Sequence, residues 1–232
     1  MQVREIIKNG LKSNSAKILL SVNFIPIIGV MFFDWNLFSI MFLYWLENLV
    51  IGIYSLLKIK KTYYYLISKQ KNLSVASRVL ATWGQVMSFV FNYGLYTIVH
   101  GVFVIAMFGM STATSPTIVN LGPVKISDII WPEISILGIL LSFIMLIISH
   151  GFSYYNNFIA QEEYKYYTIN YLSKSSFERV IALHFIIVIS GFIILAMGYS
   201  KLTIVILIII KTLIDFYAHS KEHGKKINSD IL

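Results

Sequence analysis

The chain has 232 residues, of which 57% are hydrophobic, and its mean hydropathy is +0.72. Soluble domains contain about 45–50% apolar residues, so this composition excludes an ordinary soluble protein and predicts a single transmembrane domain over residues 1–232. The net charge of +8 comes from Lys and Arg in the loops between apolar stretches, a pattern that orients membrane proteins and argues against nucleic acid as a partner. Because the chain has no cysteine, a metal would have to be bound by His, Asp or Glu.

Six apolar stretches approach the roughly 20 residues that a membrane-spanning helix needs. They predict an all-α polytopic bundle of about six transmembrane helices, at residues 17–33, 36–57, 80–108, 132–158, 177–197 and 202–221. Lys and Arg gather before the first span, after the last and in alternate loops, which predicts that both termini are cytoplasmic. We therefore expect an integral protein of a cell membrane whose partners are lipids, with the oligomeric state left open.

Two tyrosine-rich stretches with lysine within or beside them lie next to the predicted spans, at residues 62–66 and 164–171. Aromatic rings and Lys are typical of the headgroup region, so we expect amphipathic segments at the inner membrane surface there. Gly94, Gly101 and Gly191 predict places where helices approach closely.

Few ionisable side chains lie inside the predicted spans. A charged group at the bilayer centre costs roughly 3 kcal/mol even on the mildest insertion scale, so each needs a partner or a function. Lys211, Asp215 and His219 are spaced four residues apart, which places them on one stripe of the last helix. Counting about 1.5 Å per residue, Glu47 and Lys211 lie near the midplane of the bilayer.

Counting residues along the other spans in the same way places further polar groups in the inner half of the bundle. We expect His150, His184 and Asp215 about one turn toward the cytoplasm from the midplane, and His219 deeper still. His100 falls on the outer half, and Asn48 neighbours Glu47. Depth gives no helix rotation, so the convergence of these groups is an expectation.

Our leading hypothesis for this set is a metal site. Neutral imidazoles and a carboxylate suit zinc, iron or manganese, and the predicted ligands are His150, His184, Asp215 and His219. Glu47 would then be the catalytic base of a metal-dependent membrane enzyme that acts on a lipid or another membrane-accessible substrate.

Two alternatives use the same residues without a metal. In the first, the groups relay protons or bind an ion or solute in a carrier, with Lys211 and Asp215 as a switchable pair. In the second, they form hydrogen bonds that hold helices together, which average about 0.6 kcal/mol each in membranes. The sequence leaves open whether the protein is an enzyme.

Two segments carry a resemblance to known families. Trp45-x-Glu47-Asn48, together with Lys211-x-x-x-Asp215-x-x-x-His219 and the earlier His184, resembles an uncharacterised prokaryotic multi-pass membrane-protein family of unknown function over about residues 23–223. That resemblance implies several spans and supplies no activity.

A second resemblance lies at the end of the last span. His219-x-x-x-His223 is similar to the His pair of the membrane zinc hydrolases of the alkaline ceramidase and adiponectin-receptor type, which implies zinc-dependent hydrolysis. Those proteins have seven spans and a Ser-x-x-x-His pair, whereas here Leu146 precedes His150 and Tyr96 precedes His100.

Overall fold

A computed structural model describes residues 14–69, 74–109, 136–197 and 200–224. Within these ranges the chain is all-α, as predicted. The six long helices are α2 (Asn14–Phe32), α3 (Leu37–Lys69), α4 (Val75–Val104), α5 (Ile136–Ser153), α6 (Ile169–Met197) and α7 (Lys201–Gly224). Three short helices join or extend them: the π-helices η1 (Ile105–Gly109) and η3 (Tyr154–Ile159), and the 3₁₀-helix η4 (Glu163–Lys165).

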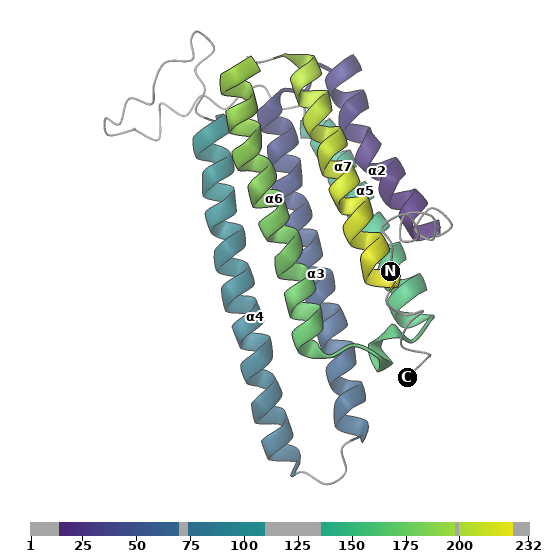
Figure 1. Cartoon of the computed structure of the whole chain (residues 1–232). Coiled ribbons are helices and arrows are strands. Elements are labelled where there is room, and N and C mark those ends of the chain that lie inside the picture. The colour runs from purple at the N-terminus through teal and green to yellow at the C-terminus, as the bar shows by residue number, and fades with distance from the viewer. Residues whose placement is uncertain (1–13, 70–73, 110–135, 198–199, 225–232) are drawn as a thin grey trace, which may run out of the picture.

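Successive long helices run in alternating directions, so α2 begins and α7 ends at the same end of the bundle (Figure 1). We call this the lower end and the opposite end the upper end. The lower end carries Lys58, Lys61, Lys165 and Lys174, as the charge pattern predicts for the cytoplasmic side. Both termini lie outside the described residues.

Five helical stretches of the described chain are long and apolar enough to cross a membrane: Asn14–Phe32, Leu37–Lys69, Trp83–Gly109, Ile136–Ile159 and Lys201–Ser220. In such segments a helix satisfies every backbone hydrogen bond internally, which is why long apolar runs fold this way in lipid. The predicted fifth span, 177–197, lies within α6, which is not among those five. The count of six spans therefore stays a prediction.

The two tyrosine-rich segments have different structures. Residues 62–66 continue α3, which runs to Lys69, because Ile59 and Leu66 pack into an apolar cluster with Phe158 of η3. Residues 164–171 form the end of η4, a short connection and the first turn of α6. Tertiary packing thus makes the first segment part of α3, and the position of both segments at the membrane surface stays a prediction.

Two apolar clusters form the core, one at each end of the bundle. The upper cluster includes Val30, Phe38, Ile40, Leu183, Ile187 and Leu207. The lower cluster includes Ile51, Ile59, Phe89, Tyr93, Phe158 and Val180. Glu47 and Asn48 of α3 belong to neither cluster and lie between the two, so the fold places these buried polar side chains at the boundary of its apolar clusters.

Glycine permits the closest approach between α3 and α4. A Cβ atom on Gly52 would lie 2.6 Å from the ring of Tyr93, and one on Gly101 would lie 2.7 Å from the indole of Trp45. Both rings donate to backbone carbonyls across this interface, Tyr93 to Asn48 at 2.8 Å and Trp45 to Thr97 at 2.9 Å. The prediction that helices approach closely at Gly101 is confirmed, whereas a Cβ atom on Gly94 would meet nothing within 4 Å.

Candidate functional site

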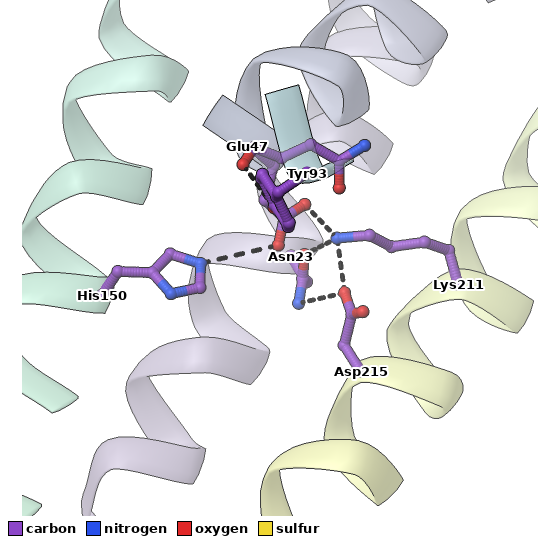
Figure 2. Close-up of polar contacts among 7 residues, drawn as sticks. Asn23, Glu47, Tyr93, His150, Lys211 and Asp215 are labelled. Carbon is purple, nitrogen blue, oxygen red and sulfur yellow. Dashed lines mark hydrogen bonds and ion pairs between the residues drawn. The ribbon is translucent and has the colours of Figure 1, made fainter. Parts of the chain in front are cut away.

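A fully buried lysine is the centre of the candidate site. Lys211 of α7 pairs with the carboxylates of Glu47 on α3 and Asp215 one turn further along α7. Its Nζ also donates to Oδ1 of Asn23 on α2 at 2.9 Å, as Figure 2 shows. We call Asn23, Glu47, Lys211 and Asp215 the charge cluster. It joins three helices at the level where the sequence predicted the membrane midplane.

Local sequence explains how each member reaches this point. Lys211 and Asp215 are four residues apart and therefore lie one above the other on α7. Asn23 is buried on α2, which packs chiefly against α7 and α5. Its Nδ2 donates to Oδ2 of Asp215 at 3.4 Å, so its amide bonds both charged partners on α7. The ring of Tyr44 lies 4.6 Å from Lys211 Nζ, a favourable cation–π arrangement.

The charges in the cluster do not cancel pairwise. Two carboxylates face one ammonium group, and a single buried charge without a partner is strongly unfavourable in a low-dielectric interior. Arg179 of α6 lies close enough for its charge to act on Asp215. A further ionisable neighbour is His150, whose charge depends on a proton.

His150 connects the charge cluster to a cavity. Its Nε2 lies 3.7 Å from Oε1 of Glu47, on the side of that carboxylate away from Lys211 (Figure 2). Its ring lies alongside that of Tyr54, with the ring centres 6.3 Å apart. Tyr54 is itself held by its hydroxyl, which donates to the carbonyl of Ile147 at 3.0 Å.

The cavity has a volume of about 40 Å³, which is room for about three waters, and five helices line it. Six of the lining residues are serines: Ser15, Ser55, Ser149, Ser153, Ser175 and Ser176. The ionisable side chains on its wall are Lys58, Arg179, His150 and His219. Among the described residues that line it, none is acidic. We call this space the serine pocket.

The helix that carries His150 changes its winding beside the serine pocket. The α-helical geometry of α5 ends at Ser153 and continues as the π-helix η3 from Tyr154. Asn157 in this segment donates to Ser15 Oγ at 2.9 Å and to Ser153 Oγ at 3.3 Å, so it ties α2 to the irregular turn. Isolated π turns are frequent at functional sites.

The other predicted site residues divide between two places. His184 lies beside His100, with ring centres 5.9 Å apart, and its ring also contacts Tyr96 and Phe103 on α4. The prediction that His184 joins the inner polar site is therefore not supported, because its rotation on α6 turns it toward α4. His219 lines the serine pocket together with His150. The side chain of His223 lies outside the described residues.

The described residues contain no group of three or more His, Asp or Glu side chains that could hold a metal ion. At the charge cluster the reason is visible, since the ammonium group of Lys211 lies where a cation would bridge Glu47 and Asp215. The zinc, iron or manganese site predicted at His150, His184, Asp215 and His219 gains no support from this arrangement.

One member of the charge cluster was not predicted. Asn23 is an amide side chain in the middle of a long apolar helix, and that position was the signal available in the sequence. Asn48 was predicted as a polar neighbour, and it is fully buried with no hydrogen bond to its amide atoms among the described residues. The hydroxyl of Tyr44 is likewise buried without a hydrogen bond among the described residues.

The fold and site define a multi-pass helical membrane protein with a buried charge cluster beside a polar pocket. Over residues 8–230 the chain matches DUF6498, a family of unknown function, and it belongs to that family. No curated protein matches the chain, and no solved structure matches it. The predicted membership of an uncharacterised family with several apolar helices is confirmed, whereas a prokaryotic source and the zinc-hydrolase likeness stay predictions.

Proposed function

We propose that this protein is a membrane carrier for protons and a small ion or polar solute. One observation carries the proposal: His150 belongs both to the charge cluster, 3.7 Å from Glu47, and to the wall of the serine pocket. A proton on His150 would change the charge balance around Glu47 and the polarity of the pocket together. Occupancy of the pocket and the state of the cluster are thereby linked through one side chain.

The free-energy cost of burying the charge cluster supports a role beyond helix association. Interhelical hydrogen bonds between neutral groups hold membrane helices at about 0.6 kcal/mol each, so buried charges are not needed for packing. Ionisable residues in membrane helices commonly mark proton relays and solute pathways. Because two carboxylates surround one lysine, one carboxylate can accept a proton while the other stays paired with the ammonium group.

The winding of α5 gives a second line of support. Carriers bind solutes where a membrane helix is irregular, because freed backbone groups take part in binding. The change from α to π geometry at Tyr154 lies about one turn below His150, directly on the pocket wall. The irregular backbone and the titratable side chain therefore lie at the same site.

Proton flux into liposomes tests the proposal. Purified protein is reconstituted with a pH-sensitive dye inside, and a membrane potential is imposed. We expect flux above that of protein-free liposomes, and a loss of at least tenfold in Glu47→Gln and in His150→Gln. Both substitutions remove the proton site and keep a polar side chain, and Gln also keeps the shape of Glu. Glu178→Gln is the matched control, because Glu178 is exposed on α6.

Each variant is first checked for folding by gel filtration and thermal unfolding in detergent. Flux equal to that of empty liposomes, or flux that Glu47→Gln and His150→Gln leave unchanged while all proteins are folded, would contradict the proposal. Metal content is measured in the same preparations, because near-stoichiometric zinc, iron or manganese that falls in His219→Ala would favour the metal-dependent enzyme instead.

A further inference from the structure

We infer that His100 and His184 form a binding site for a soft monovalent metal ion of the copper(I) class. The two histidines meet where α4 contacts α6, and neither of them lines the serine pocket, so this site is separate from the proposed carrier. On α4, His100 lies between Tyr93 of the lower apolar cluster and Val104 of the upper one. The pair therefore lies at the level of the boundary between the two halves of the bundle.

The ring nitrogens of this pair are buried and without partners. His100 is fully buried, and neither of its ring nitrogens has a hydrogen bond among the described residues. The same holds for Nδ1 of His184, whose side chain is half-buried on α6. Buried polar atoms in folded proteins are nearly always satisfied by protein groups, by water or by an ion. Three such nitrogens close together therefore indicate a ligand between them.

The spacing of the two rings matches a shared metal ion better than a direct hydrogen bond. The ring centres of His100 and His184 are 5.9 Å apart. A hydrogen bond of about 2.9 Å between two ring nitrogens would bring the centres to about 5 Å. A metal ion about 2.0 Å from one nitrogen of each ring holds the centres about 6 Å apart when the two nitrogens lie on opposite sides of the ion.

The number of ligands selects the class of metal. Within the described ranges, no third His, Asp or Glu joins these two histidines in a group that could hold a metal. Structural zinc takes four protein ligands, and calcium and magnesium require oxygen ligands. Imidazole suits copper, and the monovalent ions copper(I) and silver(I) accept two ligands in a nearly linear arrangement. A pair of histidines is therefore a complete site for an ion of this class.

The surroundings favour one positive charge over two. The ring of His184 lies 5.4 Å from that of Phe103 and 6.3 Å from that of Tyr96, measured between ring centres. Aromatic faces attract cations that lie within about 6 Å of the ring centre. Two neutral imidazoles leave the charge of the ion uncompensated, and burying an uncompensated charge costs more for a divalent ion than for a monovalent one. Aromatic rings in place of carboxylates thus disfavour zinc and the other divalent metals.

Titration of the purified full-length protein in detergent with copper(I), kept reduced by ascorbate and buffered by a coloured chelator, tests the inference. We expect one high-affinity ion per chain, and the chain has no cysteine whose thiolate would compete. His184→Phe removes one ligand and keeps an aromatic ring. It should weaken copper(I) binding by roughly a hundredfold or more, because changes to the neighbours of metal ligands alone cost about 10–100-fold. His223→Gln is the matched control, since it removes a histidine of α7.

X-ray absorption at the copper edge identifies the ligand atoms in the same preparations. We expect two nitrogen neighbours and no sulfur. Sulfur neighbours would assign the ion to some of the eight methionines and overturn the inference. His100→Leu should abolish the nitrogen signal. If that variant fails to fold, as judged by gel filtration, His184→Phe and the absorption spectrum carry the comparison.

Two other results would also overturn the site. One is absence of copper(I) binding, or equal affinity in His184→Phe and His223→Gln. The other is zinc binding that is as tight as copper(I) binding and is lost in the same variant, because it would show that further ligands complete a divalent site. Tight copper(I) binding that His184→Phe weakens and zinc does not displace confirms the inference.

Discussion

The upper and lower halves of the bundle are built from the same kinds of helix but are packed differently. In the upper half, the apolar cluster around Phe38, Ile40 and Ile187 is closed, with each of these side chains at most 2% exposed. In the lower half, the apolar cluster shares the interior with the serine pocket and the irregular turn η3. The charge cluster lies at the boundary between these two regions.

This difference separates a scaffold from a site. Close-packed side chains resist change in volume and leave few alternative arrangements. The serine hydroxyls and the two histidines around the serine pocket offer several hydrogen-bond patterns of similar energy, which is what a binding region requires. We therefore expect substitutions in the upper half to alter stability alone, and substitutions in the lower half to alter function at similar stability.

The largest effect is expected at the boundary. Lys211→Met leaves Glu47 and Asp215 buried without their shared cation, so the free energy of unfolding should fall by about 3–5 kcal/mol. Unfolding in mixed micelles measures this, with Leu213→Met as the control, because Leu213 is 61% exposed on the same helix. Equal stability of the two variants would show that the ion pairs contribute nothing.

A substitution in the upper half tests the scaffold. Ile187→Ala opens a cavity at a side chain that is 1% exposed and should lower the free energy of unfolding by about 2–4 kcal/mol. Proton flux per folded molecule should not change. Ile189→Ala, at a position 48% exposed on α6, is the control. A selective loss of flux in Ile187→Ala would break the proposed division between the halves.

A smaller effect is expected where α3 meets α4. Gly52→Val places a Cβ atom 2.6 Å from the ring of Tyr93 and displaces the hydroxyl that donates to Asn48, which should cost about 1–3 kcal/mol. Gly94→Val makes the same change on α4 where a Cβ atom meets nothing within 4 Å. If the midpoint of thermal unfolding shifts equally in both variants, the lower helix propensity of valine, and not the close approach of α3 and α4, causes the loss of stability.

The smallest effect is expected at the upper surface. Lys201 and Asp34 are 2.5 Å apart, with side chains 58% and 81% exposed. Exposed pairs are screened by water and salt, so Lys201→Gln should change the free energy of unfolding by no more than about 0.5 kcal/mol. Its comparison with Lys211→Met, ten residues along the same helix, measures what burial adds to an ion pair. A loss above about 1 kcal/mol would contradict this expectation.

The sequence was sufficient to predict the all-α fold and to place Glu47 and Lys211 at the same level of the bundle. That shared level followed from counting positions along two apolar spans, and the Lys211–Asp215 pair followed from their spacing of four. Both are one-dimensional properties of a helix, and a membrane makes them reliable because it fixes where each helix begins and ends.

Properties that depend on helix rotation were not predictable in the same way. Depth places His184 near the cluster, but the angle of α6 turns it toward His100. Asn23 joins the cluster because α2 packs against α7, a contact between the first and last described helices that no local pattern indicates. The extension of α3 to Lys69 depends likewise on its packing against η3.

The π winding of η3 also determines how the residues after it are rotated about the helix axis relative to His150. An α-helix turns about 100° per residue, so a turn that holds one extra residue rotates all that follows by that amount relative to His150. Removing Tyr155 or Asn156 would favour α geometry and swing Asn157 away from Ser15. The number of residues in this segment, more than the identity of any one of them, therefore determines which side chains below His150 face the interior.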